Sequence, residues 1–402
     1  YYGAGTTGTQ YSYEYDKTGN LTAIKKNGTT LHTYTYDSLG QLTSWYNAAT
    51  DKTVRYGYYK GGNLKNIYDG EDTVSFVYNN GDGIADRLMV YDGQLLSYDD
   101  IGNPLNFRDG ISMTWKNGRQ LATLTNGQTS ASYDYDESGI RTKKTVNGVT
   151  TTFQLDGSKI VSENRNGTVQ SYFYDENGSV LGITYGGENY YFRKNFRGDV
   201  LAILTASGEV VVEYSYDPWG NILAVTGTLA STLGADNPFR YRGYYYDTES
   251  CFYYLNSRYY DAKVCRFVNA DLVVAGVGGD LRGYNLYTYC FNNPVNRRDL
   301  SGNWCEWIES AINWVDENIV QPVAEFVSDV IEDIQNFDIT NTDEQKALNS
   351  NYFSIYKCAP VIRLPIGKNA GSFGIMFIGD EVTSPDDIRH EYGHFLQFIN
   401  MG

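Results

Sequence analysis

Two histidines near the C-terminal end of the 402-residue sequence have a spacing suited to metal chemistry. His390 and His394 lie four positions apart, so on a helix both imidazoles fall on one face, where they can share a Zn²⁺ ion. Glu391 lies between them and can reach a metal-bound water as a general base. Two of the sequence's 3 histidines take this spacing. The pattern therefore favours a hydrolytic zinc site.

The segment that carries these histidines has the signals of a helix start. Ser384 fits the N-cap, Pro385 fits the first helical position, and Asp387 stands three residues after the cap. An apolar extended segment, residues 372–378, precedes it. We expect a strand followed by a helix that holds both histidines.

This strand-then-helix arrangement resembles the zincin metallopeptidases. The resemblance implies that His390 and His394 are Zn²⁺ ligands and that Glu391 is the catalytic base. No motif identifies a third ligand, and nothing in their spacing singles out one of the nearest acidic residues, which are Asp380, Glu381 and Asp386. The alternative is an ordinary surface helix.

A different pattern, a repeated hairpin, fills the first half of the chain. Tyr13 and Tyr15 alternate with polar residues and fall on one face of a strand, and Asp16 with Gly19 fits a type I turn. Related phrases recur at 34–42, 56–64, 133–139, 172–178 and 214–220. A period of about 20 residues predicts hairpins that stack on their neighbours. Six Asn-Gly pairs, beginning at Asn27, Asn117, Asn126, Asn147, Asn166 and Asn177, predict further tight turns.

Composition limits the partners. A net charge of −16 argues against nucleic acid as a partner of the whole molecule, and no apolar run is long enough for a stable membrane span. The 38 tyrosines predict a sheet that lines a wet cavity, because each ring brings a hydroxyl that needs a partner. The 5 cysteines include no Cys-x-x-Cys pair and read as small buried residues.

From residue 237 to 302 the repeat gives way to a dense block of phrases. Among them are Asn-Pro-Phe-Arg-Tyr-Arg-Gly-Tyr at 237–244, Phe-Tyr-Tyr-Leu-Asn-Ser-Arg-Tyr-Tyr-Asp at 252–261, and the long closing phrase at 283–302. This block resembles the RHS repeat-associated core, and the array before it resembles the YD repeats of the same RHS/YD-repeat proteins.

That family includes the C components of insecticidal Tc toxins, bacterial polymorphic toxins and animal teneurins. The resemblance implies a continuous sheet that spirals into a hollow shell, a core that plugs one end, and a variable C-terminal effector. It implies a bacterial protein that is secreted or at the cell surface. Its partners would be its own tail inside the shell and a protein or peptide of a target cell.

In characterised shells the core is also an aspartyl protease that cuts the chain just after itself. By position, this role falls on Arg258, Asp271 and Asp299. One carboxylic acid can polarise the scissile carbonyl, a second carboxylate can activate water, and a cation keeps the latter ionised. Leu272 and Leu300 stand where many members have proline, and Asn303 replaces a hydrophobic residue. The alternative is a structural network of ion pairs and a turn.

After the core, residues 303–338 break from the β pattern. Apolar residues recur every three or four positions from Trp304 to Phe337, which predicts an amphipathic helix interrupted near Pro322. Its other face is acidic, which disfavours anionic membranes and favours packing against the tyrosine-rich wall. The alternative is a translocation or membrane-insertion helix.

The sequence thus predicts a mainly β protein, a spiralling YD-repeat β-hairpin shell closed by an RHS core plug and followed by a small α+β tail. We expect the shell at 1–236, the core at 237–302, a helical linker at 303–340 and a zincin-like effector at 341–402. The expected function is a carrier of a zinc-dependent peptidase toxin, with aspartyl self-cleavage after the core. The alternative is a non-enzymatic adhesion protein of YD type. We expect the sequence to be a piece of a longer protein.

Overall fold

The computed structural model describes residues 10–79, 86–271, 285–299 and 301–302, together with the backbone of five later strands. The chain divides into two compact units, Tyr1–Ile308 and Glu309–Gly402. The residues that carry the predicted metal motif, His390, Glu391 and His394, lie outside the described residues, as does all but a short strand of the predicted amphipathic helix.

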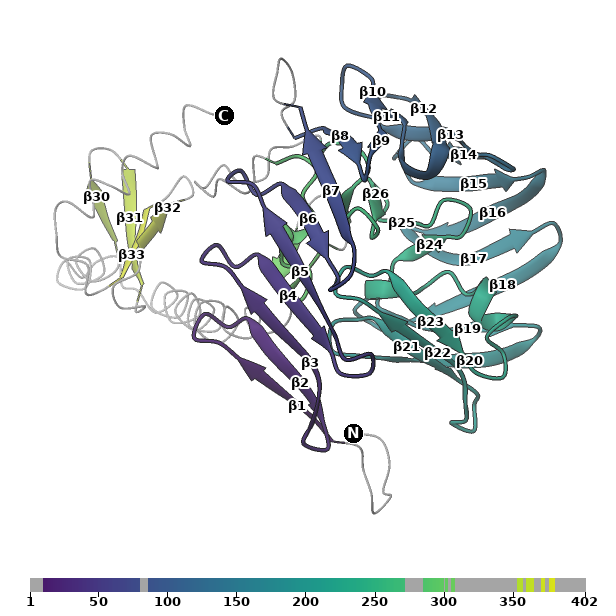
Figure 1. Ribbon diagram of the computed structural model, residues 1–402, viewed down its shortest axis with the longest axis horizontal. Coiled ribbons are helices and arrows are strands. Elements are labelled where there is room, and N and C mark those ends of the chain that lie inside the picture. The colour runs from purple at the N-terminus through teal and green to yellow at the C-terminus, as the bar shows by residue number, and fades with distance from the viewer. Residues whose placement is uncertain are drawn as a thin grey trace, which may run out of the picture. The chain divides into compact units, whose positions relative to one another are not determined.

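The hairpin repeats form two antiparallel sheets in which each strand pairs with the next along the chain (Figure 1). The first has 9 strands: β1 (Tyr11–Tyr15), β2 (Leu21–Lys26), β3 (Thr29–Tyr36), β4 (Leu42–Asn47), β5 (Lys52–Tyr58), β6 (Leu64–Tyr68), β7 (Thr73–Tyr78), β8 (Leu88–Tyr91) and β9 (Gln94–Leu95). The second has 14: β10 (Ser97–Tyr98), β11 (Pro104–Asn106), β12 (Ile111–Lys116), β13 (Gln120–Asn126), β14 (Thr129–Tyr135), β15 (Arg141–Val146), β16 (Val149–Asp156), β17 (Lys159–Arg165), β18 (Thr168–Tyr174), β19 (Val180–Tyr185), β20 (Glu188–Lys194), β21 (Val200–Leu204), β22 (Val210–Tyr216) and β23 (Ile222–Thr226).

The expected single continuous sheet is therefore divided in two. The break falls at Leu96, between the two-residue strands β9 and β10. Its side chain is buried, and its backbone N–H donates to the carbonyl of Met89 at 2.9 Å. Strands of two residues form few inter-strand hydrogen bonds. The burial of Leu96 therefore helps to hold the chain in place at this break.

The predicted Asp-to-Gly turns are confirmed. In the first, Asp16 Oδ1 accepts the backbone N–H groups of Thr18 and Asn20, both at 2.9 Å. Gly19 closes the turn with a φ of +84°, a conformation that favours glycine. The same pair of carboxylate contacts, to the residues two and four positions on, recurs at Asp37, Asp99 and Asp217.

Tyrosine hydroxyls join each hairpin to the one before it. Tyr36, at the end of β3, donates its hydroxyl to the carbonyl of Leu21, the first residue of β2, at 2.7 Å. Equivalent bonds run from Tyr58 to Leu42, Tyr98 to Leu88, Tyr174 to Ile160 and Tyr216 to Val200. Each ring thus packs on the apolar face while its hydroxyl finds a buried acceptor. This contact accounts for the repeated tyrosine before the turn.

Four of the six predicted Asn-Gly turns have positive φ at both residues, as a type I′ turn requires, and these begin at Asn27, Asn117, Asn147 and Asn166. Asn177 lies within an Asp-to-Gly turn, in which Gly178 donates its N–H to the carbonyl of Asp175. Asn126 ends β13, and its φ is not positive. These two pairs also lie in tight turns between paired strands, so the prediction of a turn is confirmed at all six.

The core block forms a small sheet between the two sheets of the array (Figure 1). It contains β24 (Tyr245–Asp247), β25 (Phe252–Tyr254), β26 (Tyr259–Asp261) and β27 (Arg266–Phe267). The described residues of the first unit also include four short helical turns: η1 (Arg108–Gly110) in the array, then α1 (Leu233–Asp236), η2 (Tyr241–Gly243) and η4 (Cys290–Asn292).

One more hairpin begins at the end of the core block. Strand β28 (Arg297–Asp299) pairs antiparallel with β29 (Cys305–Trp307), with Asp299 opposite Cys305. The expectation that β structure ends at residue 302 was therefore wrong by one strand. Gly302, between the two strands, takes a φ of +79°, a conformation that favours glycine.

Three buried Arg–Asp pairs join the array to the core. Arg141 and Asp247, both fully buried, lie 2.5 Å apart, and Arg108 lies 2.5 Å from Asp261. The third pair is Arg242 with Asp199, at 3.1 Å. Removal of one partner from such a pair strands a buried charge, which costs about 3–5 kcal/mol. These three pairs therefore fix the register in which the core packs on the array.

The second unit contributes a four-stranded sheet in the order β30 (Phe353–Tyr356), β31 (Ala359–Leu364), β33 (Met376–Gly379), β32 (Ala370–Ser372). Strands β31 and β33 are parallel, and the other pairs are antiparallel. The prediction of one extended segment at 372–378 was wrong, because Ser372 ends β32 and Met376 begins β33, and these two strands pair antiparallel. Residues 373–375 lie outside the described residues. Among the described residues, no helix is long and apolar enough to cross a membrane.

His32 gives the first sheet a measurable dependence on pH. Burial, and then the charge of Arg197, lower its pKa to about 4, and its Nδ1 accepts the indole N–H of Trp45 at 3.2 Å. A lowered histidine pKa contributes stability above the unfolded pKa of 6.5 that is lost as pH falls toward 4. His32→Asn keeps an acceptor but does not titrate. Between pH 7 and pH 4, the free energy of unfolding measured in urea should fall by roughly 2 kcal/mol more for the wild type than for the variant. Equal losses would contradict this account.

Candidate active site

The turn between β25 and β26 presents two polar side chains, Ser257 and Arg258. It is closed by the N–H of Leu255, which donates to the carbonyl of Arg258 at 2.9 Å. Asn256 takes a φ of +62°, which asparagine tolerates better than most residues. The turn carries Ser257 at the surface and Arg258 into the interior.

Arg258 gathers the predicted site residues around one guanidinium group. Its Nη2 lies 3.0 Å from Asp271 Oδ2 and 3.5 Å from Asp299 Oδ2. The three side chains are buried, at 6%, 6% and 0% exposure. Since both carboxylate oxygens reach the same nitrogen, they lie no further apart than the sum of these distances. The three residues that the family resemblance implied as site residues therefore lie together in the fold.

The other contacts of Arg258 fix its orientation. Its Nε donates to the carbonyl of Gly302, and its Nη1 donates to the carbonyl of Leu286 at 3.2 Å. Its guanidinium carbon lies 3.5 Å from the centre of the Phe267 ring, in a cation–π contact. The backbone N–H of Asp271 donates to the same Leu286 carbonyl at 2.9 Å. Arg258 and Asp271 are thus held by a shared acceptor.

Asp299 also closes a turn with its carboxylate, through the residues two and three positions on. Its Oδ1 accepts the N–H of Ser301 at 3.2 Å and that of Gly302 at 2.8 Å. Its own N–H donates to the hydroxyl of Tyr244 at 3.0 Å. Burial raises the pKa of Tyr244, and the charges of Cys290 and Asp299 add to this, so Tyr244 remains a neutral hydroxyl. Sequence reasoning singled out neither Tyr244 nor Ser257.

This arrangement can do aspartyl chemistry. Two carboxyl groups held near each other can share one proton, so that one donates to a carbonyl oxygen while the other takes a proton from water. A peptide carbonyl, that of Gly302, already lies against the guanidinium between them. The turn contacts of Asp299 show that it has a structural role as well.

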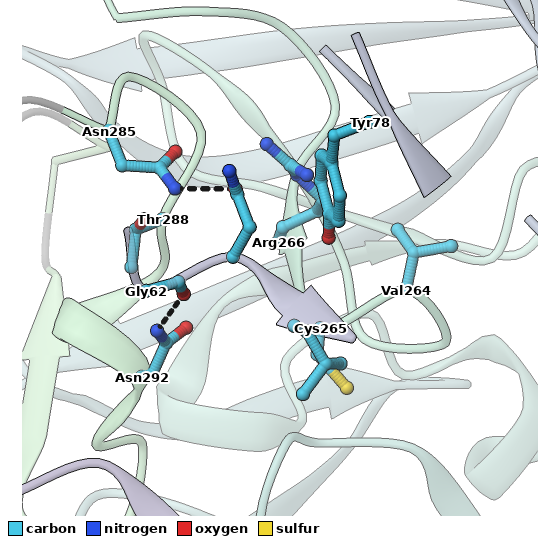
Figure 2. Close-up of a pocket in the computed structure, with 10 residues that line it drawn as sticks. Gly62, Tyr78, Val264, Cys265, Arg266, Asn285, Thr288 and Asn292 are labelled. Carbon is cyan, nitrogen blue, oxygen red and sulfur yellow. Dashed lines mark hydrogen bonds between the residues drawn. The ribbon is translucent and has the colours of Figure 1, made fainter. Parts of the chain in front are cut away.

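A small cavity lies between the array and the core, and none of the three site residues lines it (Figure 2). Gly62 and Tyr78 line it from the array, and Arg266, Asn285 and Asn292 line it from the core. Its volume of about 10 Å³ suits a single water molecule. Asn292 donates to the carbonyl of Gly62 at 2.5 Å, and this bond ties the two walls together. The described part of the chain holds no cluster of three metal-ligating side chains.

The two sheets of hairpins around a buried core define a YD-repeat shell. The family model described as the teneurin YD-shell matches residues 4–295, so the chain belongs to this family.

Several curated relatives are similar over most of the chain. The tRNA3(Ser)-specific nuclease WapA of Bacillus spizizenii is 36% identical over 278 residues, which are 67% of this chain and 12% of that protein. Double-stranded DNA deaminase toxin A of Burkholderia cenocepacia is 27% identical over 72% of this chain and 22% of its own length. Teneurin-1 of Gallus gallus is 25% identical over 74% of this chain and 11% of its own. The chain spans a small part of each relative.

Solved structures share the fold. The crystal structure of TcdB2-TccC3-TEV superposes with a TM-score of 0.58 and 20% identity, over 73% of this chain and 17% of that one. The Photorhabdus luminescens Tc holotoxin pore gives a TM-score of 0.57 and 19% identity over the same shares. These likenesses concern the fold alone.

Arg258 should be essential for the stability of this region. Arg258→Met leaves Asp271 and Asp299 buried without their shared cation, which should cost about 3–5 kcal/mol in urea unfolding. Arg193→Met is the matched control, because Arg193 pairs with Glu213 at 3.3 Å on the surface, where an ion pair contributes at most about 1 kcal/mol. Equal losses for the two variants would show that the buried network carries no special weight.

Proposed function

We propose that this protein is a secreted or cell-surface carrier shell whose core cuts the chain at or shortly after Gly302 and so separates the C-terminal effector from the shell. The single observation that carries this proposal is the guanidinium of Arg258, which contacts both carboxyl groups and donates to the carbonyl of Gly302. The family membership of the shell supports the carrier role.

The reaction is hydrolysis of one peptide bond. With one proton on the carboxyl pair, the protonated member donates to the scissile carbonyl oxygen, and the ionised member takes a proton from water. The water oxygen bonds to the carbonyl carbon and gives a gem-diol. The C–N bond then breaks as the amine leaves with a proton from the pair, and one hydroxyl of the gem-diol returns its proton to the pair as the new carboxyl group forms. Asp271 and Asp299 supply the carboxyl groups, and Arg258 offsets their negative charge and holds the chain. Their proton count is the same before and after.

For the tail we propose a zinc-dependent peptidase, on the sequence pattern at His390, Glu391 and His394. The two imidazoles would hold the metal, which polarises a bound water, and Glu391 would accept the proton of that water. This differs from the activities named for the relatives, a tRNA nuclease and a DNA deaminase. Since effectors of such shells vary from member to member, the tail's own residues carry this proposal.

The rival is a non-enzymatic adhesion protein, and the similarity to Teneurin-1 favours it. On that account Arg258, Asp271 and Asp299 are a structural network, and the tail holds no metal. The next two experiments separate the two functions.

Self-cleavage should depend on both aspartates. The wild-type chain should run as two pieces on a denaturing gel, with the mass of the larger placing the cut at or shortly after Gly302. Asp271→Asn and Asp299→Asn should each slow the cut by at least about 10²-fold, the scale of general acid–base catalysis. Asp69→Asn is the control, because Asp69 accepts the N–H groups of the residues two and three positions on, as Asp299 does, but in an exposed turn of the array. A wild-type chain that stays in one piece would contradict self-cleavage and leave the core with a structural role alone.

The metal motif should divide binding from catalysis. Glu391→Gln should keep one zinc per chain and lose peptidase activity by about 10²- to 10⁴-fold, whereas His394→Ala should lose both. Zinc content by mass spectrometry beside peptidase rate decides this. Zinc lost from Glu391→Gln together with His394→Ala would refute the assigned roles, and a zinc-free wild type would favour the rival function.

A further inference from the structure

The residue before Arg258 contacts the same short segment of chain that Arg258 holds. Ser257 Oγ donates to the carbonyl of Ser301 at 2.7 Å, and the backbone N–H of Ser257 approaches that oxygen at 3.3 Å. Arg258 Nε donates to the next carbonyl, that of Gly302. Two neighbouring residues of the turn between β25 and β26 thus hold two neighbouring carbonyls of the chain that leaves the core.

The amide groups of this segment are held from the opposite side. Asp299 Oδ1 accepts the N–H groups of Ser301 and Gly302. Both polar groups of two consecutive residues are therefore engaged, which leaves this segment little freedom to slide along the site. Segment 301–302 lies next to the two carboxyl groups, so its position decides which peptide bond meets them.

Gly302 completes the fit by having no side chain. A Cβ at this position would lie 2.6 Å from Ser257 Oγ, 2.8 Å from the carbonyl oxygen of Leu255 and 3.1 Å from the backbone nitrogen of Arg258. Backbone atoms supply two of these contacts, so rotation of Ser257 cannot relieve them. Glycine lets the chain lie flat against the turn.

We propose that Ser257 is a positioning residue for self-cleavage, and that with Gly302 it fixes which peptide bond is cut. This rests on the proposed function. Ser257 is not assigned as a nucleophile, because its hydroxyl donates to a carbonyl oxygen and so stabilises the peptide that it contacts. Its exposure at the surface means that its substitution leaves the buried core intact.

The test compares two substitutions of nearly equal shape in the full chain. Ser257→Val removes the hydroxyl, and Ser257→Thr keeps it. Ser257→Val should slow self-cleavage by about tenfold, the effect of one lost neutral hydrogen bond. It should also give fragments of more than one mass, because the chain can slide. Ser257→Thr should restore most of the rate and a single mass. A valine variant that cuts at the wild-type rate, at one bond, overturns the proposal.

Glycine variants give a second, independent comparison. Gly302→Ala should abolish the cut, because its Cβ displaces the segment. Gly208→Ala is the matched control, since Gly208 ends a four-residue turn of the array with a similar φ of +86° but has no atom within 4 Å of its added Cβ. It carries the same backbone strain without the collision and should cut normally. Equal cutting by the two variants would contradict the role of Gly302.

Hydrogen exchange separates failure of this proposal from failure of the proposed function. In the uncut Asp271→Asn background, Ser257→Val should raise the exchange rate of the Ser301 and Gly302 amides by about tenfold, and Ser257→Thr should not. Unchanged exchange with valine overturns the positioning role. Faster exchange with valine, in a protein whose wild type is never cut, overturns self-cleavage instead and leaves Ser257 as a structural contact.

Discussion

The structure depends on one local contact, the acceptance of backbone N–H groups by the carboxylate of a turn aspartate. At Asp16 and Asp37 this contact reverses the chain, and asparagines of the core then bind the residue after each turn glycine, Asn20 and Gln41. Each such bond contributes about 1 kcal/mol, and a turn that left these donors unmet would lose more than that. The repeat can therefore vary everywhere else and still return each strand beside the last.

The same contact, moved into the interior, has a different consequence. At Asp299 the carboxylate accepts two amides with one oxygen and faces Arg258 with the other. At Asp217 the core closes over the turn, and burial raises the pKa of the carboxyl to about 6. Tyrosine hydroxyls from the core then cap the carbonyls of this turn, from Tyr241, Tyr253 and Tyr260. In the interior, the carbonyls of such a turn need donors from the protein in place of water.

Sequence patterns predict what short-range physics decides. The alternation of tyrosines, the Asp-to-Gly spacing and the Asn-Gly turns each act within one hairpin, and these predictions are confirmed. The three residues of the candidate site came from resemblance, since nothing local marks Asp271 as a neighbour of Arg258. Ser257 and Tyr244 were missed because their partners, Ser301 and Asp299, lie 44 and 55 residues away. The break at Leu96 and strand β29 likewise depend on packing that no local pattern encodes.

The candidate site also depends on the most distant repeats. Strand β28, which carries Asp299, follows a segment whose asparagines bind the first turns of the array. Asn296 accepts the N–H of Leu21, 275 residues away, and Asn293 donates to Asn20. Buried amides of this kind are costly when unpaired, so this segment is stable in place only when the first hairpins are there to meet it. On the proposed function, the site that separates shell from effector is then completed by closure of the shell itself. Cleavage before closure would free an effector that nothing yet encloses, and the distance in sequence between these partners guards against that order of events.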